Sequence, residues 1–180
     1  MDILAHSLWA GAGLAVARRH VAIDRRTVAA TIVLAALPDV FHFLPVLGWG
    51  LFGDGTLAQA LAYATALPGQ APGLPPLAGL LTHHLHCTMH SAVVASAVTL
   101  VLWAMRGSLW MPLLGWWSHI IIDVFTHSAD FYPSPVLYPL TYRGFDGLAW
   151  NTPWFMLLNY AALAAVFLWV ALTRQRPVKP

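Results

Sequence analysis

Histidine and aspartate recur at helical spacing in the apolar stretch "HIIIDVFTH". His119, Asp123 and His127 are each four residues apart, so on a helix each lies only about 40° around the axis from the one before. Ionisable side chains in an apolar helix are unfavourable unless they are paired or serve a function. Imidazole nitrogen with carboxylate oxygen is the ligand mixture expected for zinc, or for iron and manganese with more open coordination. The stretch therefore predicts a metal-binding helix.

Further candidate metal ligands come from three other apolar stretches of the chain. The full set is His6, Asp39, His42, His86, His90, His119, Asp123 and His127. Of the neighbouring His83, His84 and His86, only His86 repeats the four-residue spacing, with His90. Because the three cannot all be ligands, the sequence leaves open which of them accompanies His90.

Several members of this set also have a purely structural interpretation. A single histidine in an apolar helix is most often a buried, hydrogen-bonded residue. Asp39 follows Pro38 in "LPDVFH" and could cap a helix, while His42 could be a ligand or the hydrogen-bond partner of one. His127 lies where the helix is expected to end, at Ser128. The joint presence of these residues favours a metal site over each separate alternative.

Catalytic roles fall to the aspartates, because the chain contains no glutamate. We expect Asp39 or Asp123 to serve as general base, and the lack of glutamate excludes an H-E-x-x-H metalloprotease. Arg143, in "PLTYRGFDG", could bind a phosphate with two parallel hydrogen bonds or could anchor its loop to lipid headgroups. No Walker A loop, dinucleotide fingerprint or G-x-S-x-G elbow is present.

The composition indicates that these residues are held by membrane helices. Of 180 residues, 59% are hydrophobic and 9% charged, whereas a soluble domain has about 25% charged residues. We predict an all-α, multi-spanning membrane helix bundle of a single domain, 1–180. About five transmembrane helices are expected, in residues 6–17, 27–44, 90–105, 109–125 and 154–173. The outer loops would be about 45–82 and 128–153, followed by a basic tail at 174–180.

The positive charges suggest how the bundle is oriented. With five alternating spans, the basic residues fall on one face except for Arg143: Arg18, Arg19, Arg25, Arg26, Arg106, Arg174, Arg176 and Lys179. The positive-inside rule then places the N-terminus outside and the C-terminus in the cytoplasm, in the cell (inner) membrane. These charges are topology signals and not a nucleic-acid-binding patch.

The depth of the candidate ligands can be counted from the basic ends of the helices. At 1.5 Å per residue, the candidate ligands lie roughly 15–24 Å from those ends. The residues counted in this way are His6, Asp39, His90, His119 and Asp123. Four separate segments thus bring histidine or aspartate to a similar depth, in the outer half of the bilayer. This convergence predicts one shared metal centre.

Four motifs, in order, resemble a known family. "MDILAHSLWAGAGLA", "LAALPDVFHF", "MHSAVVAS" and "HIIIDVFTH" resemble the membrane-bound metal-dependent hydrolases, first described as a domain of unknown function and distantly similar to the zinc-dependent phospholipase C and nuclease superfamily. The family pattern has Thr where this chain has Ala5, and an Arg-Gly pair that "HHLHCTMHS" lacks. The resemblance implies an all-α fold and metal ligation by His6, Asp39, His90, His119 and Asp123.

The expected function combines these inferences. We expect a hydrolase of a phosphoester or related lipid-borne bond, with one to three divalent ions, preferably Zn²⁺, and a membrane lipid or lipid-linked molecule as substrate. The alternatives are a metal-binding or metal/proton-transporting membrane protein and a scaffold whose polar residues only tie helices together. Transporter sites usually lie near the midplane between repeats, and this chain shows no repeat.

Overall fold

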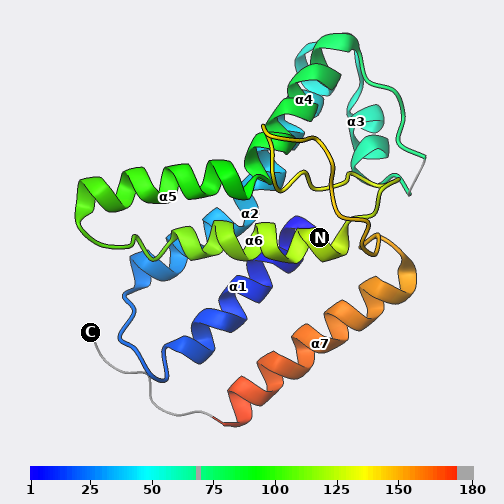
Figure 1. Ribbon diagram of the computed structural model, residues 1–180. Coiled ribbons are helices and arrows are strands. Elements are labelled where there is room, and N and C mark those ends of the chain that lie inside the picture. The colour runs from blue at the N-terminus through cyan, green and yellow to red at the C-terminus, as the bar shows by residue number, and fades with distance from the viewer. Residues whose placement is uncertain (68–69, 174–180) are drawn as a thin grey trace.

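The computed structural model describes residues 1–67 and 70–173 of the chain (Figure 1). These residues form seven helices and no β-strand, so the predicted all-α fold is confirmed. The helices are α1 (Ile3–Ala17), α2 (Arg25–Phe52), α3 (Leu57–Ala64), α4 (Pro76–Met89), α5 (Ala92–Arg106), α6 (Leu113–Thr126) and α7 (Pro153–Leu172).

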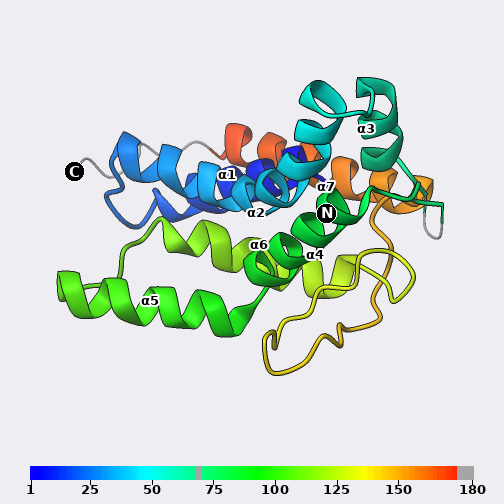
Figure 2. The ribbon, with the colours of Figure 1, turned by 90° about the horizontal axis from the view of Figure 1, so that it is seen from above.

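Helix α2 is the centre of the arrangement, because α1, α3, α4 and α6 all pack against it. Seen from above, α1, α2 and α7 lie in one layer and α5 in another, with α6 between them (Figure 2). Asp24 begins α2 by accepting hydrogen bonds from the hydroxyl of Thr27 and from the backbone N–H groups of Thr27 and Arg26. These bonds, the one from the Thr27 hydroxyl most of all, lower the pKa of Asp24. The helix continues through Pro38 and Pro45, as membrane helices tolerate when neighbours satisfy the freed backbone groups.

A glycine sets how closely α6 approaches α2. A Cβ atom at Gly115 would lie 2.0 Å from the carbonyl oxygen of Thr31 and 3.0 Å from the backbone nitrogen of Ala35. Only glycine allows this contact between the two backbones. The close approach brings His119, one turn further along α6, against α2.

Fewer helices are suited to span a membrane than the five expected. Within residues 1–67 and 70–173, only α2, with 28 residues, and α7, with 20, are long and apolar enough by themselves. The pair α4 and α5 would count as a third span, although it is bent by 60° at its junction. Helices α1 and α6 have 15 and 14 residues, or roughly 22 Å each, which is shorter than a hydrocarbon core of about 30 Å. By length and composition, the described helices thus offer two or three spans, fewer than the five predicted.

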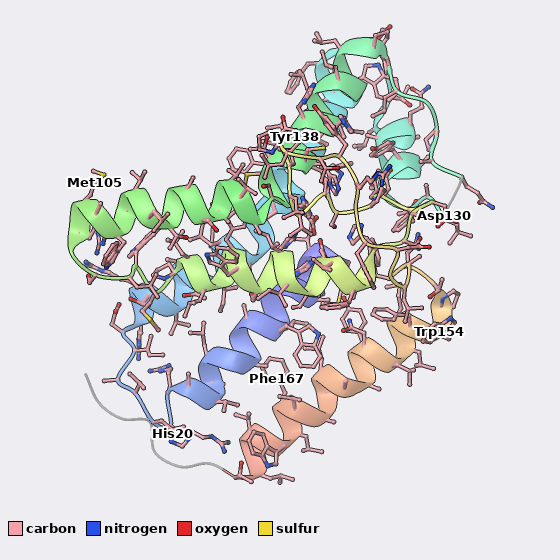
Figure 3. The ribbon with its side chains drawn as sticks, in the orientation of Figure 1. His20, Met105, Asp130, Tyr138, Trp154 and Phe167 are labelled. Carbon is pink, nitrogen blue, oxygen red and sulfur yellow. The ribbon has the colours of Figure 1, made fainter. Side chains whose placement is uncertain are left out.

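The expected outer loop at 45–82 is also largely helical. It contains the last turns of α2, all of α3 and the first half of α4. Thr56 and Gln59 begin α3 with a capping box, a signal that was hidden by the glycines and prolines around it. The segment 128–152 is a loop without helices, as expected, and it lies over the α3 and α4 end of the molecule, where Asp130 and Tyr138 mark it (Figure 3).

The basic helix ends lie away from that loop. His20, between α1 and α2, and Met105, at the end of α5, are on the side opposite Asp130 and Trp154 (Figure 3). Arg19 donates hydrogen bonds to the carbonyl oxygen of Val170 and to the hydroxyl of Thr173, which joins this end of α1 to α7. The orientation across the membrane stays a prediction, and the basic tail at 174–180 lies outside the described residues.

Candidate metal centre

A group of buried histidines and aspartates lies where α1, α2, α6 and the α4–α5 junction meet. His6, His90, His119 and Asp123 are at most 1% exposed, and Asp39 is 8% exposed. His90 lies at the bend between α4 and α5, while His119 and Asp123 occupy adjacent turns of α6. The structure thus brings together residues that are up to 117 positions apart in the chain (123 − 6).

Four of these side chains, here called the inner group, can hold a metal ion. They are Asp39, His90, His119 and Asp123, and each offers a ligand atom within 4.8 Å of the other three. The Nε2 atoms of His90 and His119 lie 3.0 Å apart. The Oδ2 atom of Asp123 is 3.2 Å from Nε2 of His90 and 3.1 Å from Nε2 of His119. The same nitrogens lie 3.6 and 3.7 Å from Oδ1 of Asp39. Two donors bound to one tetrahedral ion lie about 3.3 Å apart, so the spacing suits a shared cation.

Hydrogen bonds of the Nδ1 atoms fix the orientation of the His90 and His119 rings within the inner group. Nδ1 of His90 lies 2.9 Å from the carbonyl oxygen of His86, and Nδ1 of His119 lies 2.7 Å from that of Ala35. Because a carbonyl oxygen only accepts, both Nδ1 atoms carry a proton. In the neutral rings, the two Nε2 lone pairs then face each other. A cation between them, either a proton or a metal ion, removes this repulsion, and the arrangement is the one found behind metal-bound histidines.

His6 adds a further nitrogen beside the inner group. Its ring stacks on that of His119, with 3.7 Å between centroids. Its Nε2 lies 2.9 Å from Oδ1 of Asp123 and 4.0 Å from Oδ2 of Asp39. Nδ1 of His6 has no hydrogen-bond partner among the residues of the described ranges, while Nε2 contacts the carboxylate of Asp123. The ring therefore supplies a further buried nitrogen beside the carboxylates, which a cation would use.

His127 borders the group at the end of α6. Its Nε2 lies 3.3 Å from Oδ2 of Asp123, and its Nδ1 lies 2.7 Å from the carbonyl oxygen of Tyr132. Burial lowers the pKa of His127, which favours the neutral ring that a metal binds. The amino group of Met1 contacts Asp123 as well and lies 3.2 Å from His127 Nε2. His127 thus belongs to the same network although it lies past the last turn of the helix.

His42 and His86, here called the outer pair, lie one layer further out. Their ring centroids are 5.3 Å apart, and that of His86 is 4.1 Å from His90. Nδ1 of each is buried, with no hydrogen-bond partner in the described part of the chain. His83 and His84 are exposed. Of the three candidates, His86 is therefore the one that lies beside His90.

Arg143 is not brought to this cluster. It is exposed on the loop after α6, where its backbone nitrogen donates to the hydroxyl of Thr141. The nearby aspartates organise that loop: Asp146 accepts from the backbone of Ala129, and Asp130 accepts from the hydroxyl of Ser128. These loop residues contribute no donor atom to the inner group.

Two cavities reach the cluster from different sides. The apolar cavity, about 330 Å³, lies between α1, α2, α3 and the loop and includes Asp39 and His127 in its wall. The histidine-lined cavity, about 400 Å³, lies between α2, α4 and the loop and includes His86. His42, Tyr63 and Tyr132 belong to the walls of both.

Tyr132 is a site residue that sequence reasoning did not identify. It has a positive φ of 47°, which is uncommon for a residue with a side chain. Its carbonyl oxygen holds His127, and its ring lies 5.9 Å from His42 and 5.7 Å from Tyr63. Burial raises the pKa of the Tyr132 hydroxyl. The only signal in the sequence was its place in an aromatic and proline-rich loop that follows the helix with the candidate ligands His119 and Asp123.

Comparisons with known proteins do not identify a family, so any functional assignment depends on the chemistry of the site. The chain has no significant match to a protein family, to a curated protein or to a solved structure. What the structure establishes is an all-α chain with two or three helices able to cross a membrane and a buried Asp39, His90, His119 and Asp123 group that could hold a metal ion.

Proposed function

We propose that the protein is a membrane-embedded, metal-dependent hydrolase that acts on a phosphoester or a related bond of a lipid. The observation that carries this proposal is the inner group, in which two histidines and two aspartates offer ligand atoms within 4.8 Å of one another. Mixed imidazole and carboxylate donors at this spacing are typical of zinc. The resemblance of its motifs to membrane-bound metal-dependent hydrolases supports the same assignment.

Within this proposal, His90, His119 and Asp123 hold the ion. Backbone carbonyl groups fix both imidazole rings with Nε2 toward the centre, and Asp123 is fully buried. A bound divalent ion supplies Lewis acidity and makes water a stronger nucleophile near neutral pH. His6 and His127 border the inner group, each beside Asp123, and would hold a further ion.

Asp39 is the residue proposed to accept the proton during hydrolysis. Its Oδ2 is buried and has no hydrogen-bond partner among residues 1–67 and 70–173, and its side chain lies in the wall of the apolar cavity. A general base must reach the proton that it removes. Asp39 meets this requirement better than Asp123, because Asp123 lies deeper in the cluster. Arg143 is exposed on the loop and lines neither cavity, so the proposal assigns it no role.

Metal analysis of the purified full chain tests the first step of the proposal. We expect the wild type to retain at least one equivalent of zinc in detergent, and Asp123→Ala to lose it. Asp54→Ala is the matched control, since Asp54 is an exposed aspartate that bonds the indole of Trp49. Equal zinc in all three proteins would overturn the metal centre.

The reaction itself is tested on a panel of lipid phosphodiesters and esters with the zinc-loaded protein. We expect turnover by the wild type and a loss of about 100-fold or more for Asp39→Asn, the range in which a general base contributes. If zinc is bound, no substrate is cleaved and the protein in vesicles takes up zinc or protons, the alternative of a transporter replaces the hydrolase.

A further inference from the structure

The histidine-lined cavity contains polar groups that the proposed reaction does not use. Four side chains in its wall each have a buried polar atom without a hydrogen-bond partner in the described ranges: His42, Thr82, His86 and Tyr132. Thr82 and His86 are only 4% and 7% exposed. Buried polar groups are nearly always paired in folded proteins. Four such groups in residues that line one cavity favour a polar ligand there.

The hydrogen-bonding roles of these groups restrict the ligand. Nε2 of His86 lies 3.3 Å from the carbonyl oxygen of Pro133, so Nε2 carries the proton and Nδ1 can only accept. The ligand must therefore donate a hydrogen bond to His86. The hydroxyls of Thr82 and Tyr132 can donate or accept, so the ligand must be able to accept as well. Hydroxyl groups do both, whereas a quaternary ammonium group does neither.

The lack of charged residues in the cavity wall also favours an uncharged ligand. Among the described residues in its wall there is no aspartate, glutamate, lysine or arginine. A charged headgroup taken into the cavity would lose its water without gaining an ion pair, which is unfavourable. An uncharged group with several hydroxyls fits both the charge and the pattern of donors and acceptors.

The apolar cavity can hold a hydrocarbon chain attached to such a headgroup. The apolar cavity is bordered by Ile3, Leu4, Phe43, Phe131 and Trp150, which suit a hydrocarbon chain. It meets the histidine-lined cavity at His42, Tyr63 and Tyr132. Asp39 and His127 lie in its wall, so a molecule that occupies both cavities would place its connecting bond beside the inner group.

We infer that the substrate is a lipid with an uncharged polyhydroxy headgroup, a sugar or a glycerol, whose head occupies the histidine-lined cavity and whose chain occupies the apolar cavity. The inference rests on the proposed function for the bond that is cleaved. Binding of the headgroup requires only the two cavities and can be measured without turnover.

The test uses probes that carry bromine, which quenches tryptophan fluorescence. The phosphocholine probe is a phosphodiester that the proposed reaction could cleave, so its binding is read in the presence of EDTA. The probes are 11-bromoundecyl glucoside, 11-bromoundecyl glycerol ether, 11-bromoundecyl phosphocholine and the headless 11-bromoundecanol, added to the full chain in phosphatidylcholine nanodiscs. Since the chain has nine tryptophans, the signal of Trp150 is the difference between wild type and Trp150→Phe. We expect the glucoside or the glycerol ether to quench Trp150 at about tenfold lower concentration than the other two probes, as one or two hydrogen bonds would give.

Two conservative variants connect this preference to the cavity. Thr82→Val and Tyr132→Phe each remove a hydroxyl while keeping the shape of the side chain, and both should remove the preference for the polyhydroxy probes without changing quenching by bromoundecanol. Thr65→Val, at the exposed end of α3, is the control and should bind as wild type does. The stronger of the two polyhydroxy probes identifies the source of the headgroup.

The inference is overturned if phosphocholine or the headless alcohol quenches as well as the polyhydroxy probes, or if both hydroxyl deletions leave the preference intact. The measurement is made with and without EDTA, so it is separate from the metal centre. If the preference for the polyhydroxy probes persists while zinc binding or turnover fails, only the proposed reaction is contradicted. If zinc is bound and substrate is turned over but no probe is preferred, only the assignment of the headgroup is contradicted.

Discussion

The inner group and the outer pair are built from the same residue type but differ in how their ring nitrogens are held. In the inner group, His90 and His119 both bond a backbone carbonyl through Nδ1 and present Nε2 to the carboxylates of Asp39 and Asp123. In the outer pair, Nδ1 has no partner within the described ranges, and both residues line the histidine-lined cavity, whose described wall contains no carboxylate.

This difference indicates two kinds of histidine site. Rings that are fixed from behind and paired with carboxylates are preorganised for a cation. Rings with a free nitrogen at a cavity are suited to a ligand that enters and leaves. Spacing alone could not separate the two kinds, because His86 and His90 have the same four-residue interval as His119 and Asp123.

The largest effect should follow from removing a ring of the inner group. His119→Gln deletes an imidazole that contacts both carboxylates and stacks on His6. We expect zinc affinity, measured by competition with a chelator, to fall by roughly 100-fold. His83→Gln, which changes an exposed histidine of α4, should bind zinc as the wild type does. A fall of less than about threefold for His119→Gln would place the ion elsewhere.

Much of the candidate site could be anticipated because helices obey a simple geometry. The four-residue interval places His119 and Asp123 on one face of α6, and counting along the helices predicts that His6 and Asp39 meet them. Composition alone gave the all-α class. Local rules were sufficient wherever the ligand lay inside a regular helix.

The remaining features depend on tertiary contacts that no local pattern contains. The bend between α4 and α5 occurs at His90 and Ser91 without proline or glycine. The sequence therefore predicted the span 90–105 but not α4, the helix that precedes it. The choice of His86 over His83 depends on which side of α4 is covered. Tyr132 reaches the site through a loop, whose path sequence periodicity does not describe.

The second prediction concerns the approach of α6 to α2. Gly115→Ala would place a methyl group 2.0 Å from the Thr31 carbonyl oxygen, so α6 must move and carry His119 away from Asp39. We expect a loss of about 1–3 kcal/mol in unfolding free energy, measured by denaturation in detergent micelles, together with weaker zinc binding. Gly13→Ala is the control, since a Cβ there meets no atom within 4 Å. Equal stability of the two variants would contradict the close contact.

A smaller effect is expected at the bend that holds His90. Ser91 accepts a hydrogen bond from the backbone nitrogen of Val94 and donates one to the carbonyl oxygen of Tyr138. Ser91→Ala should lower the unfolding free energy by about 1 kcal/mol, as the loss of a helix cap does, and should weaken zinc binding less than His119→Gln. Ser7→Ala, which removes a hydroxyl bonded within α1, serves as control. A Ser91→Ala protein indistinguishable from this control would show that the cap does not position His90.

The smallest effect on the metal should come from the outer pair, and it is the sharpest test of the comparison. His86→Gln removes a ring 4.1 Å from that of His90 but leaves the backbone carbonyl of residue 86, which holds His90 Nδ1, in place. If the inner group alone fixes the tightest ion, chelator competition should give a zinc affinity within about threefold of wild type, well below the roughly 100-fold expected for a ligand. The same variant should bind the glucoside or glycerol probe less tightly, because His86 lines the histidine-lined cavity. A large loss of zinc would instead make His86 a ligand, and the two sets of histidines would then form a single extended centre.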